Sequence, residues 1–158
     1  MIIDSIVGAV DELALSMMRK EYYDCLREID ELKHKIKKSE ISYDSLRTFR
    51  NVVDSDYDQY MSIRKQRLKE IAPLEAISSD CKTAFVYRKG CGNSLEGAEW
   101  GKTDAAFQNL IMSLATKQRQ LAQLVMDMDL SKNLLESKAQ QMKEKIQEAE
   151  SNTLGENS

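Results

Sequence analysis

The sequence has few of the residues that interrupt helices. Its 158 residues include one proline and six glycines, while 31% of the residues are charged. Scarce proline and glycine together with many charged residues favour long helices over a sheet. No apolar run reaches the roughly 18 residues that a membrane-spanning helix needs, so membrane insertion is not expected.

A predominance of charge of one sign is also absent. The chain carries 23 basic and 26 acidic residues, a net charge of -3, and both signs alternate along the predicted helix faces. This balance is too even to attract nucleic acid, and it indicates solvated helix surfaces. The first 18 residues contain acidic residues but no lysine or arginine, which is not the basic start of a signal peptide.

Residues that assemble reactive sites are scarce as well. His34 is the one histidine and follows Glu31 at a spacing of three, but a di-iron bundle needs two such pairs. Cys25 falls on an apolar helical stripe, which predicts a buried small side chain. Cys81 and Cys91 lack the close spacing of a zinc site, and the pattern leaves open whether they pair. We therefore expect no enzyme activity, no catalytic residues, no metal and no cofactor.

The apolar pattern predicts an all-α fold, an elongated antiparallel helical hairpin that resembles a coiled coil and has an irregular connecting loop. We expect one domain over residues 1–150, followed by a flexible tail at 151–158. Within the domain, a helical arm covers about 4–72, the loop about 73–102, and a second helical arm about 103–149.

The first arm carries apolar residues at helical spacing in three sets. The first set is Ile6, Val10, Leu13 and Met17; after a shift of register come Tyr22, Cys25, Ile29, Leu32 and Ile36; the third is Leu46, Phe49, Val53, Tyr57, Tyr60, Ile63 and Ile71. Serines weaken the pattern at 39–45, but no glycine or proline intervenes there, so we expect the helix to continue. Pro73 should end it.

The connecting segment concentrates the turn-forming residues. It holds four of the six glycines, Gly90, Gly92, Gly97 and Gly101, which we interpret as turn residues. Residues 83–88 are prone to form a strand or a single helical turn.

The second arm carries the most regular apolar stripe. Its members alternate in steps of four and three: Phe107, Ile111, Leu114, Gln118, Leu121, Val125, Met128, Lys132, Leu135, Ala139, Met142, Ile146 and Ala149. Only Gln118 and Lys132 are polar. We expect Ile111, Leu114, Leu121, Val125, Met128, Leu135, Met142 and Ile146 to form the core or to bind partner helices.

A short motif precedes this stripe. Trp100 and Gly101 are followed by Ala105 and Phe107. A glycine frees the backbone to turn, a tryptophan covers apolar surface at the hairpin end, and alanine lets helices approach closely. We therefore interpret the four residues as the hinge of the hairpin.

This motif and the hairpin layout resemble the WXG/ESAT-like helical hairpins of type VII secretion. The closest likeness is to the YwqH-like group that accompanies LXG toxins, which has a Trp-x-Gly signature between two long helices. In this chain the tryptophan and glycine are adjacent. No Tyr-x-x-x-Asp/Glu export signal follows the last helix.

The resemblance implies a bacterial targeting partner or chaperone. Such a protein binds the helical region of an exported toxin, with or without a second small helical protein, and helps deliver it to the secretion system. It is expected in the cytoplasm, from which it can be exported together with its partner. The alternative is a self-associating coiled-coil protein, a structural or export-stalk component that forms homodimers.

Overall fold

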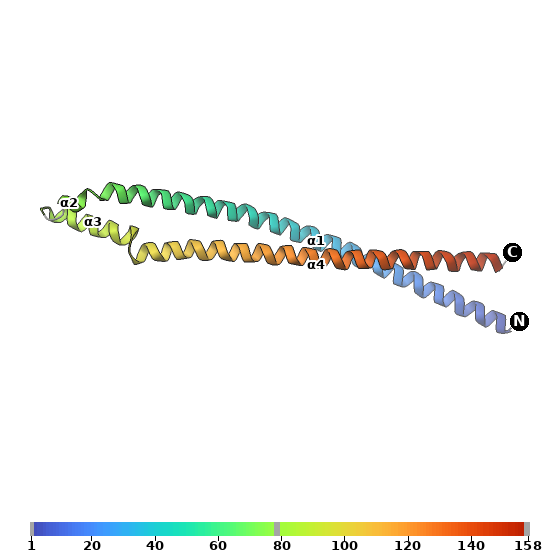
Figure 1. Cartoon of the computed structure of the whole chain (residues 1–158). Coiled ribbons are helices and arrows are strands. Elements are labelled where there is room, and N and C mark those ends of the chain that lie inside the picture. Colours follow the sequence, from blue (N-terminus) through green and yellow to red (C-terminus); the bar gives the residue numbers. More distant parts are fainter. Residues whose placement is uncertain (1, 78–79, 157–158) are drawn as a thin grey trace. The chain divides into compact units, whose positions relative to one another are not determined.

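A computed structural model of the chain describes residues 2–77 and 80–156 (Figure 1). It contains the helices α1 (Ile2–Ile71), α2 (Leu74–Ile77), α3 (Lys82–Leu95) and α4 (Ala98–Glu156). No strand occurs within the described ranges. The predicted all-α class is confirmed, and two long helices dominate the fold.

Helix α1 is continuous through residues 39–45, as predicted. Ser39 and Tyr43 are half-buried and continue the spacing of the covered face of α1. The helix therefore keeps a covered side through this segment. Just after this segment, the Thr48 hydroxyl donates a 3.0 Å hydrogen bond to the Asp44 carbonyl one turn earlier, so this polar side chain is satisfied within the helix. The helix ends at Ile71, two residues before the predicted stop at Pro73.

The prediction of an irregular loop at 73–102 is wrong for most of that segment. Residues 83–88 lie inside α3 instead of forming a strand, and Gly90 and Gly92 are helical residues there. Arg88 ties the segment together, with ion pairs to Glu75 in α2 at 3.7 Å and to Glu96 at 4.0 Å. Contacts outside the helix support this 14-residue segment, which contains two glycines and for which helix propensity alone is weak.

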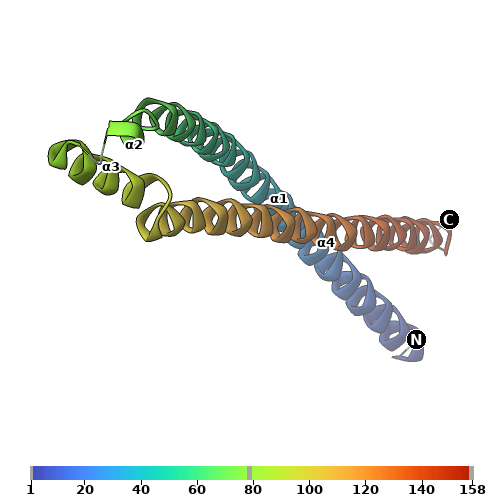
Figure 2. The same ribbon diagram turned by 60° about the vertical axis from the view of Figure 1, so that its left-hand side comes forward.

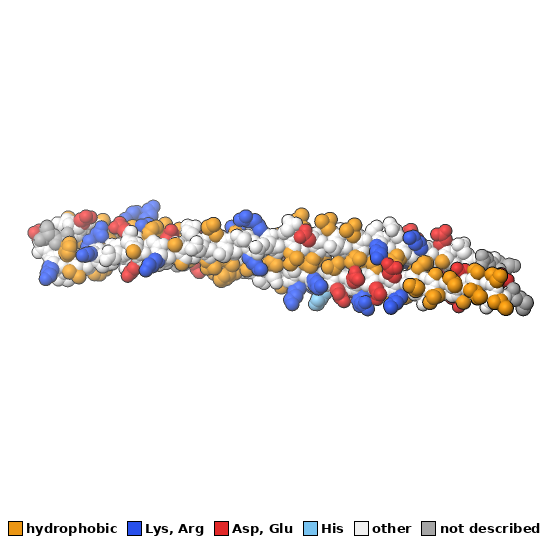
Figure 3. Space-filling view, turned by 90° about the horizontal axis from the view of Figure 1, so that it is seen from below, with side chains coloured by type: hydrophobic (Ala, Val, Ile, Leu, Met, Phe, Trp, Pro, Cys, Tyr) orange, Lys and Arg blue, Asp and Glu red, His pale blue; other side chains and the backbone are white. Residues whose placement is uncertain are grey.

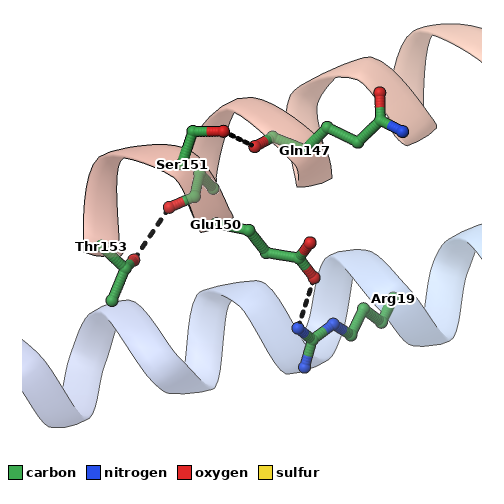
Figure 4. A network of polar contacts seen from close by, with 6 residues as sticks. Arg19, Gln147, Glu150, Ser151 and Thr153 are labelled. Carbon is green, nitrogen blue, oxygen red and sulfur yellow. Dashed lines mark hydrogen bonds and ion pairs between the residues drawn. The ribbon is translucent and has the colours of Figure 1, made fainter. Parts of the chain in front are cut away.

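Two boundaries of α4 also differ from the expectation. The helix begins at Ala98, five residues before the predicted start at 103, and it continues to Glu156 through most of the expected flexible tail. Near its end, Ser151 donates to the carbonyl of Gln147 and Thr153 to that of Ala149, so the polar side chains bond back onto their own helix (Figure 4). Residues 157 and 158 of the predicted tail lie outside the described residues.

Contacts group the chain into two compact units. The first contains Met1–Ile41 and Leu121–Ser158, and the second contains Ser42–Gln120. Both long helices contribute to both units, so this grouping does not test the expectation of a single domain.

In the first unit, α1 and α4 pack against each other in antiparallel directions. The core is formed by Cys25, Ile29 and Ala139, with Tyr22 and Leu135 packed against it. Ion pairs join the two helices along their length: Arg19–Glu150 at 2.5 Å, Glu21–Lys138 at 3.2 Å and Lys33–Glu136 at 4.0 Å. The N-terminal end of α1 and the C-terminal end of α4 diverge (Figures 1 and 2).

The second unit contains the other antiparallel stretch of α1 and α4 together with α2 and α3. Its buried apolar residues include Val53, Ile71 and Leu114. Phe107 packs between Tyr57 and Tyr60, with ring centroids 5.4 Å from each. The antiparallel helix pairing that the sequence predicted is therefore present in each unit.

Candidate helix-docking surface

The predicted stripe of α4 lies on the face of that helix that is turned toward α1. Ile111, Leu121, Val125, Met128, Leu135 and Met142 are half-buried, and Leu114 and Ile146 are buried. The Cys25 thiol, buried as predicted, donates a 3.4 Å hydrogen bond to the carbonyl of Leu135. In the single chain this stripe is covered largely from within.

Gln118 is the polar residue inside that stripe and is only 7% exposed. Its side-chain oxygen accepts a 3.2 Å hydrogen bond from Arg50 of α1. Lys132, the other polar stripe position, is half-buried and forms a 3.6 Å ion pair with Asp129 on its own helix. The buried amide thus has a charged partner on the opposite helix, which favours one alignment of the pair over its shifted alternatives.

The four predicted hinge residues have different surroundings. Trp100 is half-buried in the first turns of α4, and Phe107 packs on two tyrosines of α1. Gly101 and Ala105 are exposed helical residues, and a side chain at Gly101 would meet nothing within 4 Å. The predicted turn at Gly101 is therefore wrong.

The turn between α3 and α4 lies at Gly97. A Cβ atom there would stand 2.8 Å from the carbonyl oxygen of Asn93, too close for any residue except glycine. The backbone N–H of Gly97 donates a 3.2 Å hydrogen bond to the Gly92 carbonyl. Close approach of the backbone to itself, and not a left-handed conformation, is what requires glycine at this point.

Arg64 joins three helices, and the sequence analysis missed it. Its Nε donates a 2.7 Å hydrogen bond to the carbonyl of Leu95 at the end of α3, where helix carbonyls lack partners of their own. Its guanidinium carbon lies 3.9 Å from the ring centroid of Trp100, a cation–π contact. The sequence does indicate this position, because Arg64 continues the helical spacing of Tyr57 and Tyr60. Hydropathy alone selects its apolar neighbour Ile63 instead.

A polar network accompanies these contacts. The Tyr57 hydroxyl donates a 2.6 Å hydrogen bond to Asp104 and accepts one of 3.0 Å from Gln108. The hydrogen bond to Asp104 is the main cause that raises the pKa of Tyr57 above its usual value. The hydrogen bond thus favours the neutral form of the tyrosine, which donates to Asp104.

Residues 2–17 of α1 present an apolar face that no other part of the described chain covers. Seven side chains on it are each 54–78% exposed: Ile2, Ile3, Ile6, Val7, Val10, Leu13 and Met17. Figure 3 shows apolar side chains gathered at this end of α1. We call this set the N-terminal apolar face. Part of it, Ile6, Val10, Leu13 and Met17, was predicted as an ordinary helical stripe.

This face spans roughly 140° of the helix circumference, given about 100° per residue. That width is what a helix uses when it packs on a neighbour. The face has a defined end, because the positions that continue its spacing are charged: Lys20, Asp24, Arg27 and Glu31.

Two acidic side chains line a groove on the side of α1 that is turned toward α4. Asp11 and Glu12 line a groove of about 510 Å³ between α1 and α4, together with Leu15, Met18 and Ala149. Neither carboxylate has a hydrogen-bond or ion-pair partner among the described residues. The groove is thus acidic, whereas the N-terminal apolar face lies on a different side of α1.

The described residues bring no metal site together. No group of three or more histidine, cysteine, aspartate and glutamate side chains lies within reach of one ion in residues 2–77 and 80–156. Cys81 and Cys91 are free thiols, which answers the question of pairing that the sequence left open. No helix in the described ranges has both the length and the apolar character of a membrane span.

No protein-family model, curated protein or solved structure matches this chain.

Proposed function

We propose that this protein is a non-enzymatic helical partner protein, which binds the helical region of an exported, LXG-type toxin and helps deliver it to a type VII secretion system. The observation that carries the binding role is the N-terminal apolar face. Seven large apolar side chains are too many to leave in water on one short stretch of helix without a partner.

The shape of the surface indicates a helix as the partner. Ile3, Ile6, Val10, Leu13 and Met17 follow one another in alternating steps of three and four, the spacing by which one helix packs along another. An amphipathic helix that lies along this stripe buries the apolar side chains of both. The toxin and secretion setting rests on the resemblance carried by Trp100, Gly101, Ala105 and Phe107.

Self-association is the second candidate, and the same spacing supports it. Two copies that paired through their N-terminal apolar faces would form a homodimer with no need for another protein. The two candidates differ in what they predict for the purified chain.

Size-exclusion chromatography with light scattering separates them. The chain is measured alone and after co-expression with the helical region encoded by the neighbouring gene. We expect a stoichiometric heterocomplex and poor solution behaviour of the chain alone. A well-behaved homodimer that the neighbouring product leaves unchanged would contradict the proposal.

A further inference from the structure

We infer that the outward side of α3 binds an acidic amphipathic helix of another protein. In the second unit, α3 lies at the end where α1 finishes and α4 begins (Figure 2). This surface is separate from the N-terminal apolar face, and the inference does not rest on the proposed function. It follows from the spacing, exposure and charge of four residues.

These four residues share one side of α3. They stand at positions i, i+3, i+4 and i+7 of the helix: Lys82, Phe85, Val86 and Lys89. At about 100° per residue, they fall within roughly 100° of its circumference. All four are exposed, Phe85 to 51% and Val86 to 59%. We call this set the α3 basic face, in which an apolar pair lies between two lysines.

The opposite side of α3 packs on the rest of the second unit. Its half-buried residues include Ala84, Arg88, Cys91 and Leu95. Arg64 of α1 donates a 2.7 Å hydrogen bond from its Nε to the carbonyl of Leu95. The α3 basic face is therefore directed away from the chain, where a partner can reach it.

Uncharged residues surround the α3 basic face. The flanking positions carry Thr83, Gly90, Gly92 and Asn93. Residues 82–95 contain no aspartate or glutamate. Neither lysine of the face forms an ion pair with another described residue. The positive charge of this side of α3 is thus not compensated on the helix itself.

The carboxylates before and after α3 do not compensate it either. Glu75 and Glu96 form ion pairs with Arg88, at 3.7 Å and 4.0 Å, on the inner side of the helix. Asp80 is the one carboxylate between them and lies in the turn before α3. The two lysines therefore offer cations that carboxylates of a partner can match.

A helix is the partner whose geometry matches this charge. At 1.5 Å per residue, the two lysines stand about 10.5 Å apart along α3. A second helix with acidic residues at i and i+7 presents its carboxylates at the same separation, in either direction. If its positions i+3 and i+4 are apolar, they cover Phe85 and Val86 between the two ion pairs.

A second copy of this chain fits the surface poorly. Two α3 basic faces laid together would bring lysines of both copies into one interface, which weakens the contact. Carboxylates seven residues apart occur in four pairs: Asp4 with Asp11, Glu21 with Glu28, Asp24 with Glu31, and Asp129 with Glu136. In none of these pairs do both intervening positions, i+3 and i+4, carry apolar side chains. The complementary helix therefore belongs to a different protein.

A lipid surface also fits poorly. Helices that lie on a bilayer bury a broad apolar face and carry lysine or arginine on the opposite, polar side. The exposed side of α3 has only Phe85 and Val86 as apolar residues, and its lysines lie on the same side as this pair. Insertion of the apolar pair would take both lysines toward the acyl chains.

Three synthetic helical peptides of about three heptads test the inference. The first carries glutamate at i and i+7 and leucine at i+3 and i+4, and the second has lysine in place of the two glutamates. The third has the composition of the first, with both glutamates moved by two positions to another side of the helix. Chemical shifts of the backbone amides of the full chain measure binding and locate it. We expect the first peptide to shift amides of α3 and to bind about tenfold more tightly than the others at low salt, with the difference shrinking as salt is added.

Charge reversal on the chain gives a matched comparison. Lys82→Glu with Lys89→Glu should make the lysine peptide the tighter binder. Lys102→Glu with Lys117→Glu makes the same charge change at exposed positions of the same unit and should leave the order of the peptides as it is.

The apolar pair has its own control. Phe85→Ser should weaken binding of the first peptide about tenfold, because the contact loses its largest apolar side chain. Tyr87→Ser removes an aromatic residue that is 59% exposed on another side of α3, and it should leave binding unchanged. Circular dichroism establishes that all variants keep the helicity of the parent chain.

Each other outcome overturns the inference. Equal binding of the three peptides would remove the role of charge and spacing, and absence of binding would remove the α3 basic face as a docking site. Tighter binding to phosphatidylglycerol vesicles than to the first peptide, or a homodimer that Phe85→Ser dissociates, would assign the face to lipid or to a second copy. None of these results bears on the N-terminal apolar face or on the proposed function.

Discussion

Two stretches of α1 have the same apolar spacing but different surroundings. Residues 22–36 carry Tyr22, Cys25, Ile29, Leu32 and Ile36, which face α4, and Ile29 is only 4% exposed. Residues 3–17 carry an equally regular stripe, yet its members point to solvent. The register shift between the two stretches explains the difference, because it moves the apolar stripe from one side of the helix to another.

This difference teaches that a regular stripe predicts a helix contact but not which contact. The covered stripe stabilises the chain itself, whereas the uncovered stripe adds nothing to the folded state of the isolated chain. Substitutions in the two stretches should therefore affect different measurements.

The largest expected effect is on stability, at the covered stripe. Ile29→Asp buries a carboxylate in the core of the first unit and should cost about 4 kcal/mol, because the charge loses its hydration without gaining a partner. Thermal unfolding followed by circular dichroism should show a midpoint lower by roughly 10 °C. A midpoint within one or two degrees of the parent would mean that Ile29 does not lie in a core.

The second effect is on binding, at the uncovered stripe. Val10→Asp with Met17→Asp should weaken the complex with the partner helix about a hundredfold, because two apolar contacts are lost. The unfolding midpoint should stay where it is, since both side chains are exposed in the isolated chain. Calorimetric titration measures the first quantity, and a destabilised chain would show that the face is covered after all.

The motif in the first turns of α4 extends the comparison to the second unit. Trp100→Ala should cost about 2 kcal/mol, because the contact with Arg64 and half-buried apolar surface are lost. Gly101→Ala should stabilise the chain by about 0.5–1 kcal/mol, since the site is helical and open. Denaturant titrations measure the free energy of unfolding, which should fall for Trp100→Ala and rise for Gly101→Ala. Destabilisation by Gly101→Ala would restore Gly101 as a hinge.

A smaller expected effect compares what the half-buried Arg50 and the exposed Phe49 contribute to the free energy of unfolding. Arg50→Ala should cost about 1 kcal/mol, because it leaves the buried amide of Gln118 without its partner. Phe49→Ala, next to it and exposed, should cost less. If Phe49→Ala lowered the free energy of unfolding in urea more than Arg50→Ala, the face of α1 that packs on α4 would have to be reassigned.

The smallest effect concerns Tyr57. Tyr57→Phe removes its hydrogen bond to Asp104 and should lower the melting midpoint slightly at pH 8. The pKa of Tyr57 is raised, so its contribution is present below the unfolded value of about 10 and is lost as pH rises through the higher folded value. The gap between parent and variant should therefore narrow at the most alkaline pH, and a constant gap would contradict this role.

The sequence predicted the helices better than their polar contacts. Steps of three and four along α4 identified its covered face, because burial imposes that period on apolar residues. The same rule failed on α1 where arginines occupy the covered face, at Arg50 and Arg64. A long arginine stem packs like an apolar side chain while its head bonds to the opposite helix, so hydropathy alone points to Phe49 and Ile63 instead.

The turn and the docking surface illustrate two other limits. Gly97 and Gly101 look alike in the sequence, and only the backbone of Asn93 beside Gly97 distinguishes a required glycine from a tolerated one. The stripe at Ile6, Val10, Leu13 and Met17 was visible in the sequence. That no described part of the chain covers it could not be predicted, because this depends on where α4 packs.

Hydrogen exchange of the isolated chain, repeated in the complex, tests the central claim most directly. We expect amides of residues 22–36 to be protected in both samples, since their helix is held by α4. Amides of residues 3–17 should exchange rapidly in the isolated chain and become protected when the partner helix binds. Equal protection of the two stretches in the isolated chain, or no change at residues 3–17 in the complex, would contradict the account.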